Sequence, residues 1–141
     1  MEQNVKPKIL VVEDDRNIRK VVTRTLSKKY DIQEAGDGWE AIQKSENSFD
    51  LVILDIMMPG IAGDSAFTAM DSDLNNENLE TAQAPPTLLL TALPETDERV
   101  KRLIKKENIV GYIQKPFHAA ALLEKIDALL DPSSDQDALD K

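Results

Sequence analysis

The chain has 141 residues and no cysteine, which suits one domain with its own core and excludes disulfides, thiolate metal sites and thiol chemistry. A formal charge of −9 disfavours direct binding to nucleic acid or anionic lipid, and a single histidine nearly excludes a histidine dyad or metal cluster. No apolar run approaches the ~20 residues that cross a membrane, and the first eight residues lack the apolar core of a signal peptide, so we expect a soluble cytoplasmic protein.

Strand and helix patterns alternate in the first part of the chain. The short β-branched run Lys8–Val12 predicts a strand, and apolar residues three and four positions apart predict a helix that ends near Lys29. The apolar side of this helix is expected to face the core through Ile18, Val21, Val22 and Leu26. Its other side is basic, and we interpret it as a solvated face: Arg16, Arg19, Lys20, Arg24, Lys28 and Lys29. A weaker strand, Asp31–Ala35, and a helix over about residues 39–47 follow.

The run Leu51–Leu54 consists of apolar residues only, which is typical of a strand buried on both faces in a parallel sheet. It ends on Asp55, and Pro59 and Gly60 turn the chain shortly afterwards. In an open α/β sheet, ligands bind outside the carboxyl ends of the strands. Asp55 is therefore either an acid displayed at that edge or an acid that begins a loop.

The second part of the chain continues the alternation. A helix is expected to begin near Asp64, and the acidic residues 71–86 then form a loop that is either a partner contact or a tolerated insertion at the amino end of the sheet. The remaining elements are strands at 87–90 and 110–113 and helices from Pro94 to about Lys106 and over Ala119–Leu130. The first of these helices is expected to face the core through Val100, Leu103 and Ile104.

Five strand-and-helix alternations predict an α/β fold, with a doubly wound parallel sheet of five strands and helices on both of its faces. We expect one domain over residues 1–131 and a disordered tail over residues 132–141. Asp15, Asp37 and Asp64 are interpreted as loop or helix-capping acids.

A parallel sheet would gather the residues that follow its strands at one edge: Glu13, Asp14, Asp55, Thr91 and Lys115. Two carboxylates ~4 Å apart repel by roughly 4 kcal/mol at an effective dielectric constant near 20, so the cluster requires a cation or protons. Oxygen ligands without histidine or cysteine suit Mg²⁺ or Mn²⁺. The set indicates phosphoryl transfer, with a carboxylate as nucleophile and the lysine and metal neutralising the phosphoryl oxygens.

Four motifs, each at the end of its own strand, carry a resemblance to a known family. They are Val11 to Asp15, Leu54 to Pro59, Thr91 with Ala92, and Lys115 with Pro116 and Phe117. In this order, from about residue 8 to 130, they resemble the receiver domain of two-component response regulators. The resemblance implies a flavodoxin-like fold with strand order 2-1-3-4-5, and an Asp55 that takes a phosphoryl group from a phosphohistidine of a histidine kinase or histidine phosphotransfer protein.

The resemblance also implies a metal site. Asp14 and Asp55 would bind Mg²⁺ (or Mn²⁺) directly, together with the backbone carbonyl of Met57, and Glu13 would act through a metal-bound water. The domain would catalyse only its own phosphorylation and dephosphorylation, so it is not expected to be an enzyme.

A switch is implied by the same resemblance. Thr91 matches the switch hydroxyl, Lys115 the phosphate-binding lysine and Tyr112 the switch aromatic, and the Lys115–Pro116 peptide bond is often cis in this family. The face made by the helix after the fourth strand, the fifth strand and the last helix would then bind a downstream effector protein. From the residues alone, Tyr112 can equally be a core aromatic and Thr91 an ordinary strand end. The basic residues of the helix on that face are either a site for an acidic partner or a solvated surface.

Two rival functions stay open. One is a receiver-like interaction module that works without phosphorylation, although such modules usually lack the acidic pair, the acceptor or the lysine. The other is a Mg²⁺-dependent aspartyl phosphohydrolase, but the haloacid dehalogenase type has a second Asp where this chain has Met57. Nothing after Leu130 resembles an output domain, so a stand-alone receiver is expected, with no direct contact to nucleic acid or membrane.

Overall fold

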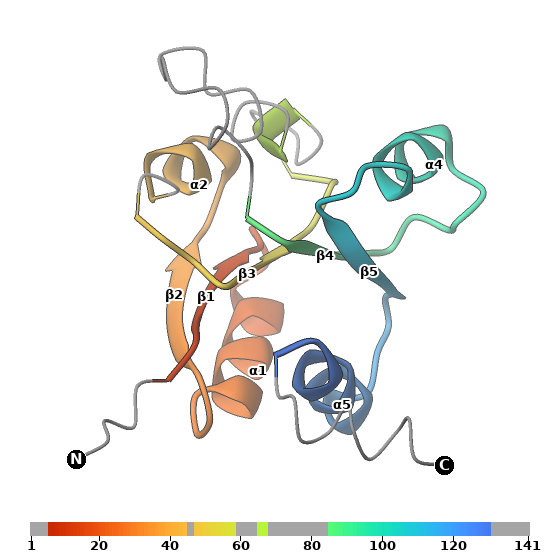
Figure 1. The fold of residues 1–141 in the computed structure, drawn as a ribbon. Coiled ribbons are helices and arrows are strands. Elements are labelled where there is room, and N and C mark those ends of the chain that lie inside the picture. Colours follow the sequence, from red (N-terminus) through yellow and green to blue (C-terminus); the bar gives the residue numbers. More distant parts are fainter. Residues whose placement is uncertain (1–5, 45–46, 59–64, 68–84, 131–141) are drawn as a thin grey trace.

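The computed structural model describes residues 6–44, 47–58, 65–67 and 85–130. Its five strands are β1 (Lys8–Val12), β2 (Asp31–Ala35), β3 (Leu51–Leu54), β4 (Thr87–Thr91) and β5 (Ile109–Gln114). They form one sheet in the order β2-β1-β3-β4-β5, with every neighbouring pair parallel (Figure 1). The predicted sheet and its strand order are thereby confirmed.

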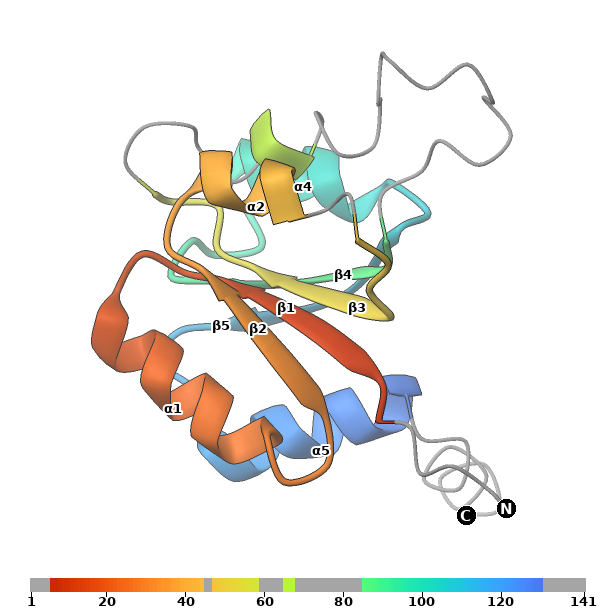
Figure 2. The ribbon, with the colours of Figure 1, turned by 90° about the vertical axis from the view of Figure 1, so that its left-hand side faces the viewer.

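Helices cover both faces of the sheet, as predicted. They are α1 (Arg16–Leu26), α2 (Gly38–Lys44), α4 (Glu98–Ile104) and α5 (Ala119–Leu130). Helices α1 and α5 lie on one face, and α2 and α4 lie on the other (Figure 2). Among the described residues, no helix has the length and apolar character that crossing a membrane requires.

Each central strand contributes side chains to two separate hydrophobic cores. Along β1, Ile9 and Val11 pack in the core under α1 and α5, whereas Leu10 and Val12 pack in the core under α2 and α4. All four side chains of Leu51–Leu54 are buried in the same alternating way. Because successive side chains of a strand point to opposite faces, a strand covered on both sides is apolar at most positions. The continuous apolar runs of the sequence have this cause.

Two residues expected in the core lie at the surface. Val21 is 47% exposed and Ile104 is 40% exposed. Val22 and Leu26 are buried four residues apart, and successive helix residues are about 100° apart, so Val21 falls on the flank of that narrow stripe. Ile104 is the last residue of α4 and lies beside the stripe formed by Val100 and Leu103. The sequence pattern therefore overestimated the width of both apolar faces.

Helix boundaries follow the capping residues. Asp15 accepts hydrogen bonds from the backbone N–H groups of Asn17 and Ile18 and starts α1, and Asp37 accepts one from the N–H of Glu40 at the start of α2. The interpretation of Asp15 and Asp37 as loop or helix-capping acids is thereby confirmed. Helix α4 begins only at Glu98, because Asp97 caps it; the residues from Pro94 to Asp97 form a turn instead.

Several element ends differ from the sequence expectation by a few residues. Helix α1 ends at Leu26 rather than near Lys29, and β5 is longer than the predicted strand at 110–113. The expected helix after Asp64 is seen at residues 65–67, where Ala66 and Phe67 are buried. Asp64 itself, most of the acidic segment 71–86 and the tail 132–141 lie outside the described residues.

Candidate functional site

The register of the sheet brings the predicted site residues to one edge. Val12 of β1 lies beside Leu54 of β3, so Glu13 and Asp55, the residues that follow them, are neighbours. The backbone N–H of Asp55 donates to the carbonyl of Val12 at 3.1 Å. Carboxylate oxygens of Glu13, Asp14 and Asp55 all lie within 4.8 Å of one another. The sequence expectation that these three acids converge is correct.

Lys115 directly follows β5, at the opposite end of the strand order from β2, and its side chain extends to this cluster. Its backbone N–H donates to the carbonyl of Thr91 at 2.8 Å, and this fixes the end of β5 beside the end of β4. The ammonium Nζ then lies 2.6 Å from Oε1 of Glu13 and 3.0 Å from Oδ2 of Asp55. Glu13 is 2% exposed and Asp55 5%, so one cation is shared by two buried carboxylates. Asp14 is exposed to solvent.

Burial and charge act against each other on the ionisable groups of this site. Burial raises the pKa of Glu13 above its ordinary value of 4.5, although the hydrogen bonds from Lys115 and from the backbone of Asp15 oppose the rise. Burial alone would lower the pKa of Lys115. Its hydrogen bonds to Glu13 and Asp55 outweigh that effect, so the pKa of Lys115 lies above its ordinary value of 10.5. Lys115 thus stays an ammonium, and its hydrogen bond favours the ionised form of Glu13.

The predicted switch residues meet at Leu93 rather than at the acids. The hydroxyl of Thr91, which is fully buried, accepts a hydrogen bond from the backbone N–H of Leu93 at 3.3 Å. The hydroxyl of Tyr112 donates to the carbonyl of the same residue. Tyr112 also packs, partly buried, against the core under α2 and α4. The alternative interpretation of Tyr112 as a core aromatic therefore agrees with part of its environment.

Met57 lies directly beside Asp55, the predicted acceptor. Its backbone N–H donates to Oδ1 of Asp55 at 3.0 Å, and its side chain is half exposed. This hydrogen bond fixes one oxygen of Asp55, while Lys115 holds the other. The role of the Met57 carbonyl as a metal ligand stays a prediction.

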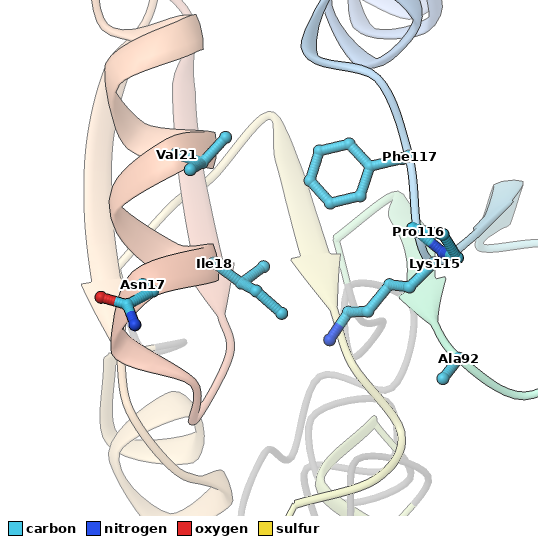
Figure 3. A pocket seen from close by; sticks show the side chains of 7 residues that line it. All are labelled: Asn17, Ile18, Val21, Ala92, Lys115, Pro116 and Phe117. Atoms are coloured by element: carbon cyan, nitrogen blue, oxygen red, sulfur yellow. The ribbon is translucent and has the colours of Figure 1, made fainter.

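A hollow of about 510 Å³ adjoins the site between α1 and the segment that follows β5. Ile18 and Val21 line it from α1, and Phe117 faces them from the other side (Figure 3). Lys115 and Pro116, which are joined by a cis peptide bond as the family resemblance implied, complete that side. Lys115 belongs both to this hollow and to the acid cluster. The exposed side chain of Val21 is part of the apolar lining of the hollow.

One residue of the site was missed by the sequence interpretation. Arg19 was expected on a solvated face, but its side chain is only 20% exposed. Its Nη1 donates to the backbone carbonyl of Glu13 at 2.7 Å, and its Nε donates to Oε1 of Glu34 at 2.9 Å. Helical spacing cannot reveal this contact, because it depends on how α1 crosses β1 and β2. The one available signal was the acidic Glu34 on the adjacent strand.

Fold and site together define a class of protein. A parallel sheet of order β2-β1-β3-β4-β5 with helices on both faces is the flavodoxin-like form of the doubly wound fold, which binds ligands at the carboxyl edge of its strands. In this chain that edge carries three acids and a lysine.

A family model described as the response regulator receiver domain matches residues 9–127. The chain belongs to this family. The transcriptional regulatory protein ResD of Bacillus subtilis is 35% identical over 92% of this chain and 50% of ResD. The hybrid signal transduction histidine kinase D of Dictyostelium discoideum is 34% identical over 86% of this chain and 7% of that kinase. The chain thus spans half or less of these relatives, and the expected stand-alone organisation stays a prediction.

Solved structures of similar proteins agree with this assignment. The chemotaxis protein CheY4 of Vibrio cholerae is 30% identical with a TM-score of 0.72, covering 89% of this chain and 100% of CheY4. The response regulator TrrA of Thermotoga maritima, solved in complex with Mg²⁺ and BeF, is 31% identical with a TM-score of 0.67, covering 88% of this chain and 99% of TrrA.

The shared lysine leads to a prediction about stability. Replacing Lys115 with Met leaves two buried carboxylates without their cation, so the free energy of unfolding at pH 7 should fall by about 3–5 kcal/mol. Urea unfolding followed by circular dichroism, with a chelator present, measures the change. Lys101→Met is the control, since Lys101 is exposed and pairs only loosely with Glu98 at 3.9 Å; it should change stability by less than ~0.5 kcal/mol.

The effect of Lys115→Met should also depend on pH. A raised pKa means that the folded state holds the proton of Glu13 more tightly than the unfolded state, so ionising Glu13 costs stability as pH rises above about 4.5. Without Lys115 the pKa of Glu13 rises further, and the loss should be smaller at pH 5 than at pH 7. Equal losses at both values would contradict this account of the site.

Proposed function

We propose that the chain accepts a phosphoryl group on Asp55 from a phosphohistidine of a sensor kinase or histidine phosphotransfer protein, in a reaction that depends on Mg²⁺. The observation that carries the proposal is the sharing of Lys115 between Asp55 and Glu13 within a cluster of three carboxylates. A structural acid at a strand end needs neither a buried lysine nor two further acids beside it. The family to which the chain belongs supports the same function.

The transfer itself requires little covalent chemistry from the protein. A carboxylate oxygen of Asp55 attacks phosphorus while the bond from phosphorus to the imidazole nitrogen breaks, and the leaving imidazole keeps the electron pair. No general base is needed because a carboxylate has no proton to lose. The hydrogen bond from Met57 and the contact with Lys115 orient the two oxygens of Asp55, and Lys115 can neutralise charge on the transferred group.

The acids of the site fit a hard divalent cation. Every available side-chain ligand is a carboxylate oxygen, and Mg²⁺ prefers oxygen ligands while keeping several waters. Asp14 and Asp55 would hold the ion with the carbonyl of Met57, and Glu13 would act through a metal-bound water. When bound, the ion would offset the charge of the transferred phosphoryl group.

Phosphorylation can be tested without knowing the natural donor. Incubation with acetyl phosphate and Mg²⁺ should add the mass of one phosphoryl group, and a chelator should prevent the gain. Asp55→Asn should abolish it, because the amide is not a nucleophile, and intact-mass spectrometry reads both results. Asp37→Asn is the matched control: Asp37 follows β2 at the same edge, is exposed, and caps α2 through a bond that Asn can also accept.

The mass measurement, together with an assay of phosphate release, separates the rival functions. No mass gain in the wild-type chain would favour an interaction module that works without phosphate. Sustained release of phosphate from small phosphate esters would favour an aspartyl phosphohydrolase. A gain that survives in Asp55→Asn would move the acceptor to another residue and end the proposal for Asp55.

The proposed output is a change of the surface formed by α4, β5 and α5. Thr91 and Tyr112 both bond to Leu93, so a Thr91 hydroxyl that turns toward a phosphoryl group would release the N–H of Leu93 and alter the support of Tyr112. The phosphoryl group can shift this equilibrium only through contacts that differ between the two states. Exposed basic residues of and after α4 would suit an acidic effector surface: Lys101, Arg102, Lys105 and Lys106.

Beryllofluoride with Mg²⁺, as a mimic of the phosphorylated acid, tests this switch. In the wild-type chain, its addition should shift the backbone NMR signals of Asp55 and also those of α4 and β5. In Thr91→Ala the shift at Asp55 should remain, while those in α4 and β5 should shrink at least several-fold. Thr25→Ala is the control because Thr25 lies on α1 and bonds only within that helix. Undiminished shifts in α4 of Thr91→Ala would exclude Thr91 as the link.

A further inference from the structure

The turn that carries two of the three acids is fixed by its backbone. The N–H of Glu13 donates to the carbonyl of Ala35 at 3.1 Å, which extends the pairing of β1 with β2 by one residue. The N–H of Asp15 donates to Oε2 of Glu13 at 3.0 Å, and Asp15 in turn caps α1. These hydrogen bonds fix the backbone of residues 13–15, and the backbone in turn fixes the directions in which the side chains of Glu13 and Asp14 leave it.

Arg19 holds the remaining polar group of Glu13 in that turn. Its Nη1 donates to the Glu13 carbonyl at 2.7 Å, a charge-assisted hydrogen bond in a half-buried setting. This carbonyl lies at the peptide that joins Glu13 to Asp14, so its orientation sets the direction of the Asp14 backbone as well. The contact lies one peptide away from an acid expected to ligate the metal.

The guanidinium is itself held in place. Its Nε bonds to Oε1 of Glu34 at 2.9 Å, while the hydroxyl of Thr23, one helical turn later, bonds to Oε2 of Glu34 at 3.1 Å. Gly36 provides the space: a Cβ atom at that position would lie 3.3 Å from Nη1 of Arg19, which is a tight contact. Residues of α1 and β2 thus support one guanidinium, whose rigid fork reaches two acceptors at once.

We propose that Arg19 is a positioning residue of the phosphorylation site. It holds the β1–α1 turn so that Glu13 and Asp14 converge with Asp55 before a divalent cation arrives, and so sets the affinity of the cluster for that cation. The three acids repel one another, and an unsupported turn would relax by moving them apart. The cation would then have to draw them together again, which weakens its binding. This inference rests on the proposed function.

Charge and geometry predict opposite results for Arg19→Gln. If Arg19 mattered through its positive charge alone, removing it near an acidic site would tighten the binding of Mg²⁺. A positioning role predicts the reverse, about 10- to 100-fold weaker binding, as is typical when partners behind metal ligands are lost. Arg19→Lys keeps the charge but lacks the fork, so it should weaken binding as well. Gly36→Ala should shift the affinity in the same direction by a smaller factor, because it only crowds Nη1.

The measurement is the dissociation constant of Mg²⁺ for the unphosphorylated full chain, obtained by calorimetry or NMR titration without any phosphodonor. Arg24→Gln is the matched control: Arg24 is exposed on the same helix and should change the constant by no more than about twofold. Urea unfolding of each variant shows that it is folded under the titration conditions, and Gly36→Ala tests the idea should Arg19→Gln fail to fold.

The outcomes distinguish a failure of the positioning role of Arg19 from a failure of the proposed function. If the wild-type chain does not bind Mg²⁺, the proposed function itself is in error. If the wild type binds Mg²⁺ while Arg19→Lys and Gly36→Ala bind it as tightly, Arg19 is only structural and the inference is overturned. Tighter binding by Arg19→Gln would overturn it too, because the residue would then act by charge.

Discussion

The ammonium group of Lys115 compensates the negative charge of the buried carboxylates at the carboxyl edge of this sheet. Glu13 and Asp55 are almost fully buried, and their oxygens lie within the same small volume as those of Asp14. Such a cluster opposes folding unless a cation compensates it, and Lys115 supplies that compensation from the end of β5. The site is therefore held together by attraction across the sheet between segments about a hundred residues apart in the chain. Lys115 thus compensates the two buried acids, while Asp14 of the same cluster is exposed to solvent.

Much of this arrangement could be predicted from the sequence because it depends on short-range rules. Leu51–Leu54 is apolar at every position because both of its faces are covered. This pattern can be recognised in the sequence without knowing which helices cover the strand. A parallel sheet then places Glu13, Asp55 and Lys115 at one edge whatever the details of packing. Asp15 and Asp37 cap helices through their own backbone neighbours, so their roles were also local.

The remaining features depend on contacts that no pattern encodes. Whether Arg19 meets solvent or the carbonyl of Glu13 is decided by the path of α1 over β1 and β2. Val21 lines a hollow opposite Phe117 rather than packing in the core, and the placement of that segment is not encoded in the pattern of α1. The convergence of Thr91 and Tyr112 on Leu93 involves main-chain groups, which carry no residue preference that a sequence pattern could show.

The convergence of two side-chain hydroxyls on Leu93 limits which residues this position accepts. Leu93 serves Thr91 through its N–H and Tyr112 through its C=O, and every amino acid except proline offers both groups. The side chain of Leu93 packs against the core under α2 and α4, so the position excludes proline through its backbone contacts and favours an apolar residue through its packing. Backbone contact and side-chain packing thus set separate requirements at one and the same residue.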